Sequence, residues 1–210
     1  MDQLLAFYRS HGLQDWADAL DGLAWPESSG EDGFEPVALM PPVALQRAQT
    51  ERLLEAMTAP TDALPADEHY AGYWVRSVEA LTDCERLERP EGPYALWLRD
   101  GPFPESTLGL TCTKLVKEMK AHGWTGLTVH EFLVVERLQA LRHGDHRWSS
   151  YHEHEGHPPG IQWLPSARSG KEVFQGYWVA KSGQVQIGAC ATGSKKPTRG
   201  AHPCRVTPLS

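Results

Sequence analysis

A histidine-rich segment holds the side chains of this sequence that are best suited to chemistry. It reads HGDHRWSSYHEHEGHPP and contains His143, His146, His152, His154 and His157. Imidazole and carboxylate groups together form the zinc, nickel and copper sites of proteins, and alternate residues of an extended segment lie on one side. The segment is therefore a candidate metal site, and in a metal-dependent hydrolase Glu136 or Glu155 would serve as the base.

The spacing of these histidines argues against a dedicated site. No His-Glu-x-x-His pattern on a helix is present, and a flexible loop would lose conformational entropy on binding a metal. We therefore expect adventitious affinity for nickel or zinc and no cofactor, with zinc or another transition metal as the alternative. A pH-responsive segment is a further hypothesis, because histidines titrate near neutral pH.

Residues 128–141 carry the strongest helix pattern of the chain. The Thr128 side chain can cap the first turn, and the Glu131 side chain can accept a hydrogen bond from the Thr128 backbone amide, which is a capping box. On a helical wheel Val129, Phe132, Leu133 and Ala140 share one face, and Val134, Leu138 and Leu141 lie on the far side. An apolar surface this wide predicts a helix that is buried on more than one side.

Glu136 falls on the apolar face of that helix, where an ionised carboxylate is costly unless it is paired. The functional interpretation is a carboxylate with a raised pKa, available for proton transfer or metal binding. The structural interpretation, which we favour, is that Glu136 reaches the rim or pairs with an Arg or a Trp N–H.

The cysteines do not form a disulfide pattern. Cys84, Cys112, Cys190 and Cys204 are few and scattered, so reduced thiols in a cytoplasm are expected. Cys190, His202 and Cys204 would supply three metal ligands if the tail returned beside the last strand. A structural zinc site normally needs four ligands, so two buried thiols at a sheet end are the favoured interpretation.

The net charge and the absence of several sequence motifs exclude other classes of function. The net charge of −7 argues against broad nucleic-acid binding, and the basic cluster Lys195, Lys196 and Arg199 is expected to be a solvated turn. Residues 188–195 superficially resemble a phosphate-binding loop, but Pro197 follows where a helix should begin. No apolar run of about 18 residues exists to span a membrane. The sequence contains no nucleophile elbow and no dinucleotide-binding glycine pattern.

Tryptophan is unusually frequent, with 8 in 210 residues. Buried tryptophans fill a core, and exposed ones favour a protein or ligand interface. Trp148, Trp163 and Trp178 are the candidates for binding. Trp163 and Trp178 would line a small-ligand pocket between the 128–141 helix and the C-terminal sheet.

The order of elements predicts an α+β fold. Residues 1–25 form a short helical appendage that docks on the main domain or on a partner, 26–33 a linker, and 34–210 a single domain. Helices are expected at 43–57, 78–84, 111–122 and 128–141, and strands at 34–39, 73–75, 94–98, 162–164, 173–180 and 184–189. Residues 94–98 give the best central strand. The 128–141 helix packs on a mixed sheet that ends in an antiparallel hairpin, turning at 181–183.

Several segments in this order are similar to those of a known family. They are residues 93–98 (PYALWL), 126–131 (GLTVHE), 163–168 (WLPSAR), 177–180 (YWVA), 187–190 (IGAC) and 202–205 (HPCR). The chain resembles, over roughly residues 34–206, an uncharacterised bacterial family frequent in actinobacteria. The resemblance supports the fold and implies no activity or site residues.

The expected function is a cytoplasmic, non-enzymatic α+β module that binds a protein partner. It follows from the lack of a catalytic motif, of a basic surface and of a membrane segment, together with the many tryptophans. The alternatives are a metal-binding protein or metal-dependent hydrolase that uses residues 143–157, and a small-ligand pocket protein. No sequence feature bears on the oligomeric state.

Overall fold

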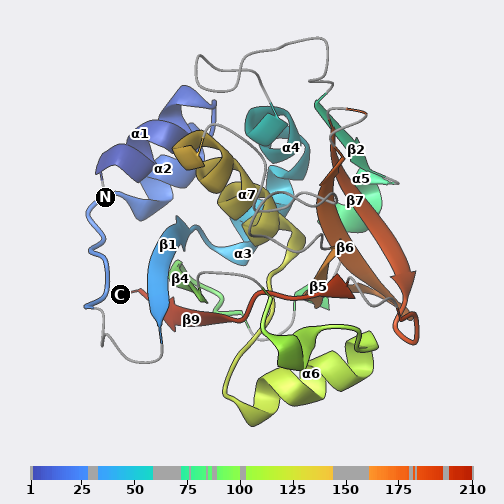
Figure 1. Cartoon of the computed structure of the whole chain (residues 1–210). Coiled ribbons are helices and arrows are strands. Elements are labelled where there is room, and N and C mark those ends of the chain that lie inside the picture. The colour runs from blue at the N-terminus through green and yellow to red at the C-terminus, as the bar shows by residue number, and fades with distance from the viewer. Residues whose placement is uncertain are drawn as a thin grey trace.

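Helix α7 (Val129–His143) lies between two β-sheets in the computed structural model (Figure 1). The structure describes residues 2–27, 33–58, 72–75, 77–83, 85–86, 89–99, 103–143, 161–179, 182, 184–195 and 199–209. Helices and two separate sheets make up the chain, so the predicted α+β class is confirmed. The helix packs against strands of both sheets, where a single mixed sheet was expected.

The first sheet is antiparallel and has the order β1-β4-β9. Its strands are β1 (Phe34–Met40), β4 (Tyr94–Arg99) and β9 (Cys204–Pro208). The prediction of a central strand at 94–98 is confirmed, because β4 pairs on both sides and these residues are buried. The pairing of β9 with β4 was not predicted.

The second sheet is mixed and has the order β2-β7-β6-β5-β3, with β8 paired to β5. Its strands are β2 (Gly72–Val75), β3 (Glu85–Arg86), β5 (Ile161–Ser169), β6 (Glu172–Val179), β7 (Gln184–Ala191) and β8 (Arg199–Gly200). Strands β6 and β7 are antiparallel, and Val179 pairs with Gln184. The predicted C-terminal hairpin is therefore confirmed.

Two helices occupy the region where a single helix was predicted at 43–57. Helix α3 (Val43–Ala48) is followed by its C-cap Gln49, and α4 (Thr50–Thr58) begins at the next residue. The hydroxyl of Thr50 donates to the carbonyl oxygen of Arg47 at 3.0 Å. A side chain that hydrogen-bonds local backbone in this way competes with the helix ladder, which accounts for the break.

The remaining helices are α5 (Val78–Thr82), the 3₁₀ turn η1 (Glu105–Thr107) and α6 (Cys112–Ala121). Cys112, Leu115 and Met119 of α6 belong to a second apolar cluster that also contains Trp163 of β5. Within the described ranges, none of the helices has both the length and the apolar character needed to cross a membrane.

The N-terminal helices α1 (Asp2–Ser10) and α2 (Gln14–Leu20) share the main core. The Tyr8 hydroxyl donates to the Leu39 carbonyl of β1 at 2.8 Å, and the Tyr8 and Trp16 rings pack edge to face. Figure 1 shows both helices beside α7 and above β1. The segment predicted as an appendage therefore forms one wall of the space around α7.

The predicted capping box of α7 is confirmed. The Thr128 amide donates to the Glu131 carboxylate at 2.8 Å, and the Glu131 amide donates to the Thr128 hydroxyl at 3.3 Å. All residues from Val129 to Arg137 are buried, together with Ala140. The helix is thus enclosed on more than one side, as its wide apolar surface predicts.

Candidate functional site

A cavity of about 400 Å³ lies where α1, β1 and the C-terminal half of α7 meet. The residues that line it are Gln3, Leu4, Trp25, Glu35, Pro36, Val37, Leu98, Val135, Leu138, Gln139 and Arg142. Small-molecule sites are typically concave, roughly 300–1,000 Å³ in volume and lined by apolar groups with a few polar ones. In size and lining the cavity has these properties.

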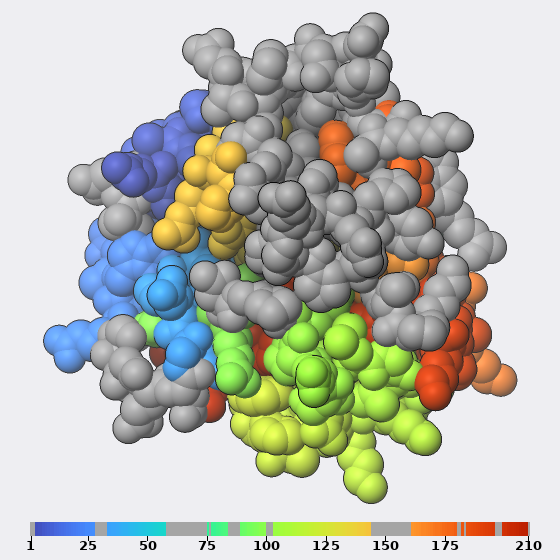
Figure 2. Space-filling view, viewed as in Figure 1, coloured from blue at the N-terminus to red at the C-terminus, as the bar shows by residue number. Residues whose placement is uncertain are grey.

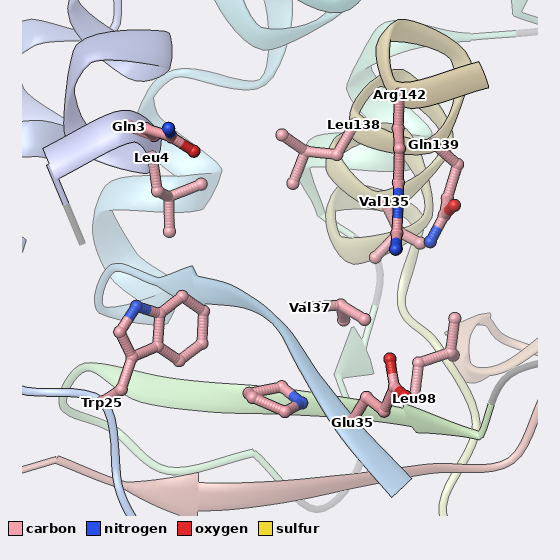
Figure 3. Close-up of a pocket in the computed structure, with 11 residues that line it drawn as sticks. Gln3, Leu4, Trp25, Glu35, Val37, Leu98, Val135, Leu138, Gln139 and Arg142 are labelled. Atoms are coloured by element: carbon pink, nitrogen blue, oxygen red, sulfur yellow. The ribbon is translucent and has the colours of Figure 1, made fainter.

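The apolar side chains of the cavity wall come from four elements. Leu4 comes from α1, Val37 from β1, Leu98 from β4, and Val135 and Leu138 from α7. Figure 3 shows Leu138 pointing toward Leu4 across the cavity. Because residues three apart on a helix are neighbours, Val135 and Leu138 present one continuous apolar surface.

Trp25 forms a further apolar wall, below Leu4 in the view of Figure 3. It follows α2 and is half-buried against the main core. A half-exposed indole offers apolar area together with an N–H donor, which suits a ligand contact. It also gives the cavity an intrinsic fluorescent reporter.

Four polar side chains surround the opening. Gln3 and Glu35 lie on the side of α1 and β1, and Gln139 and Arg142 belong to α7. In Figure 3 the Arg142 side chain runs along α7 toward β1, and the Glu35 carboxylate points from β1 toward α7. Both charged residues are exposed. The opening therefore carries one negative and one positive group around an apolar interior.

Neither charged group has a partner among the described residues. Within the described part of the chain, Glu35 and Arg142 form no hydrogen bond or ion pair with another residue. A carboxylate accepts hydrogen bonds and a guanidinium donates them in a planar fork. Both groups thus retain their full capacity to bind charges of a ligand.

Sequence spacing explains why these side chains converge. Arg142 lies one turn beyond Leu138 on α7, so the guanidinium extends from the apolar surface of the helix. Glu35 and Val37 are alternate residues of β1, and Glu35 pairs in register with Leu98. The strand register shifts between Pro36 and Ala38, and this bulge at Val37 brings both Glu35 and Val37 into the wall of the cavity.

A buried polar cluster fixes the other end of α7. The guanidinium of Arg89 donates to the Glu131 carboxylate from Nε at 2.5 Å and from Nη2 at 2.7 Å. The Tyr94 hydroxyl donates to Glu131 at 2.7 Å and accepts from the Gln46 amide at 3.2 Å. Arg89 also donates to the Gly126 carbonyl at 2.5 Å.

Arg89 and Glu131 each stabilise the charged form of the other. Burial alone would raise the pKa of Glu131, but Arg89 together with hydrogen bonds from Thr128 and Tyr94 holds that pKa below its ordinary value. Burial would lower the pKa of Arg89, and Glu131 raises it above its ordinary value. Proton exchange near neutral pH is therefore disfavoured, so the cluster is suited to support and not to acid–base catalysis.

The predicted carboxylate Glu136 lies far from solvent, with 2% of its surface exposed. It does not reach the rim, which leaves pairing as the remaining form of the structural interpretation. Glu136 interacts with another residue, and its pairing with an Arg or a Trp N–H stays a prediction. Glu136 is not among the described residues that line the cavity.

The histidine segment falls almost entirely outside the described residues. His143 is exposed at the end of α7. His146, Trp148, His152, His154, Glu155 and His157 lie outside the described ranges. Among the residues that the structure describes, no group of three or more His, Cys, Asp or Glu side chains is placed to hold a metal ion. The metal hypothesis for residues 143–157 stays a prediction.

Cys190, His202 and Cys204 are not brought together as a metal site in the described chain. Cys190 belongs to β7 and Cys204 to β9, which lie in different sheets. Cys204 is buried and donates to the Thr125 carbonyl at 3.2 Å, whereas Cys190 is only half-buried. The expectation of two buried thiols at one sheet end is therefore wrong, because the tail pairs with β4.

Two further expectations concern tryptophan and arginine. Trp163 is fully buried, and the Arg199 guanidinium lies 4.4 Å from its ring centroid. Arg199 is 2% exposed and donates to the Ser194 hydroxyl at 2.9 Å. The prediction that Arg199 forms a solvated turn is wrong, since stacking on an indole holds it inside. Trp178 is half-buried against the main core.

Sequence reasoning missed the residues of the cavity. Trp25 was placed at the border of a linker, and Glu35 and Arg142 have the appearance of ordinary surface charges. The sequence does contain one signal for this cavity. Leu138, with Arg142 one turn later, lies on the far apolar side of the predicted helix, and an apolar face of this kind must pack against another part of the chain. The N-terminal helices supply that partner, because Leu4 of α1 lines the same cavity as Leu138.

Comparisons with protein families, with curated proteins and with solved structures find no match for this chain. The resemblance to an uncharacterised bacterial family stays a prediction. Function is therefore argued from the residues alone.

Proposed function

We propose that this protein is a non-catalytic binding module whose cavity between α1, β1 and α7 takes a small zwitterion with an apolar body. A free apolar amino acid has this chemistry. The single observation that carries the proposal is the apolar interior flanked by Glu35 and Arg142, two opposite charges without a protein partner among the described residues.

Each part of such a ligand has a complementary group. The Arg142 fork would bind a carboxylate with charge-assisted hydrogen bonds, and Glu35 would accept from an ammonium group. The apolar side chain would enter the space among Leu4, Val135 and Leu138. Burying that side chain contributes about 1.5–3 kcal/mol, and the rim charges select the ligand.

The lining supports binding over catalysis. The described residues around the cavity include no Ser, Thr, Cys, His or Lys, so they offer no nucleophile beside a base. The carboxylate of Glu35 is exposed and stands alone. A protein of this kind would sense or carry its ligand.

A protein partner is the second candidate. Trp25, Val37 and Leu138 are half-buried apolar side chains at one opening, and aromatic residues are enriched in protein interfaces. The same cavity would then take an apolar side chain of the partner.

The free thiols of Cys112, Cys190 and Cys204 support the cytoplasm as the location.

A ligand series in a calorimeter tests the proposal. Phenylalanine carries both charges, phenethylamine lacks the carboxylate, and 3-phenylpropionate lacks the ammonium group. We expect phenylalanine to bind with a Kd below about 1 mM and each analogue to bind at least about 3-fold more weakly. Equal affinity for all three compounds, or no heat with phenylalanine or other apolar amino acids, would reject the zwitterion.

A further inference from the structure

Two neighbouring cavities lie on the opposite side of the molecule from α1, where the end of α6 meets β5 and β9. One has a volume of about 250 Å³ and the other of about 470 Å³. They share Lys120, Trp124 and Thr125 in their walls. Figure 1 shows α6 beneath both sheets with β9 above it, and in Figure 2 α6 forms the lower part of the surface. We call this pair of cavities the α6–β9 groove.

The α6–β9 groove is cationic in a chain whose net charge is −7. Lys120 and Arg168 line the smaller cavity, and Lys120 and Arg205 line the larger one. None of the described residues around either cavity is Asp or Glu. Cations that line a concave site raise the local concentration of anions there.

Arg168 gives the groove an unsatisfied donor. Its Nε is buried, and among the described residues Arg168 Nε has no hydrogen-bond partner and Arg168 forms no ion pair. The Cys112 thiol lies close to Arg168, but burial raises the pKa of that thiol to about 11, so it carries no charge at neutral pH. A buried donor without an acceptor costs about 1–3 kcal/mol, which a bound anion would recover.

Hydroxyl groups and a fixed indole complete the groove. The hydroxyls of Ser166 and Thr125 lie 3.1 Å apart in the smaller cavity. Trp124 lines both cavities, and the His122 ring stacks on it with centroids 4.4 Å apart. The Arg99 guanidinium lies 5.5 Å from the Trp124 ring centroid. A wall supported in this way keeps its position when a ligand enters.

We propose that the α6–β9 groove binds a small phosphorylated molecule, with its phosphate held by Arg168 and Lys120 beside the Ser166 hydroxyl. Guanidinium and hydroxyl groups suit phosphate oxygens, and the larger cavity beside Arg205 has space for the rest of the molecule. The cations line two small concave spaces and the whole chain is acidic, so a small anion is favoured over a long nucleic-acid strand.

Calorimetric titration with pyrophosphate at low salt tests this inference on the full chain. We expect saturable binding, weakened at least about 10-fold by Arg168→Gln and by Lys120→Gln. Lys117→Gln is the matched control, because Lys117 is an exposed cation of α6 that is absent from the described lining of both cavities. Lys120 is exposed, so Lys120→Gln tests the groove even if Arg168→Gln fails to fold.

Two outcomes would overturn the inference. Loss of affinity in Lys117→Gln equal to that in Arg168→Gln would indicate diffuse surface charge and no site. Binding of a single-stranded oligonucleotide without binding of pyrophosphate would indicate a nucleic-acid surface. The Arg142→Gln variant should keep its affinity for pyrophosphate, which separates this groove from the cavity beside α1.

Discussion

Arg89 and Glu131 form a buried ion pair that ties the segment before β4 to the first turn of α7. The Nε–Oε1 distance is 2.5 Å, and the side chains are 1% and 0% exposed. Arg89 also donates to the Thr125 hydroxyl at 3.2 Å, so it bridges the residues on which α7 begins. The pair therefore fixes the helix whose other end carries Leu138 and Arg142.

Glu131→Gln should lower the free energy of unfolding by about 3–5 kcal/mol, because it leaves the Arg89 guanidinium buried without a counter-charge. Urea denaturation measures the change. Glu118→Gln is the control, since Glu118 faces only the exposed His122 ring at 3.7 Å, and it should cost less than about 0.5 kcal/mol. A loss below about 1 kcal/mol for Glu131→Gln would contradict the role of the pair.

The free energy of unfolding should fall in acid because the Glu131 carboxylate becomes protonated. The folded-state pKa of Glu131 lies below its ordinary value of 4.5, so the folded state binds fewer protons than the unfolded state. The stabilisation is complete above that ordinary value and is lost as the pH falls below it. Thermal unfolding followed from about pH 7 to about pH 3 should show a steeper decline for the wild type than for Glu131→Gln. Parallel curves would count against the assignment.

The sequence predicted local features better than long-range ones. The capping box at Thr128, the burial of α7 and the strand at 94–98 depend on residues close together in the chain, and the structure confirms them. The pairing of β9 with β4 depends on residues more than one hundred positions apart. No short-range pattern encodes that partner.

The candidate site was missed for the same reason. Arg89 precedes β4 and Glu131 lies in α7, so composition shows two unrelated charges where the fold makes one ion pair. Trp25, Glu35 and Arg142 converge only because α2 and α7 both pack on β1. The histidine segment is visible as a candidate site in the sequence because its residues are neighbours in the chain.

Gly176→Ala should lower the free energy of unfolding by about 1–3 kcal/mol. A methyl group at Gly176 would lie 2.4 Å from the Phe132 ring, on the surface where β6 supports α7. At Gly188 of the adjacent strand β7, the nearest atom would be 3.6 Å away, so Gly188→Ala serves as the control and should fold normally. Equal effects of the two substitutions in urea denaturation would show that this close approach is unimportant.

Leu138→Trp should fill the cavity and abolish ligand binding while it changes the free energy of unfolding by less than about 1.5 kcal/mol. Leu138 is half-buried at the opening, so a larger side chain extends into free space. Leu141→Trp is the matched control, because Leu141 is also half-buried on α7 and is not among the described lining residues. Retained binding in Leu138→Trp would place the ligand elsewhere.

The most direct measurement is calorimetric titration of phenylalanine, phenethylamine and 3-phenylpropionate into the wild type, Arg142→Gln and Glu35→Gln. The account predicts that Arg142→Gln lowers the affinity for phenylalanine and for 3-phenylpropionate by about 3- to 10-fold. The affinity for phenethylamine should not change. Glu35→Gln should weaken the binding of phenylalanine and of phenethylamine and leave the affinity for 3-phenylpropionate unchanged. If each substitution changed all three affinities alike, or none of them, the two charges would not recognise the ligand and the proposed zwitterion site would be wrong.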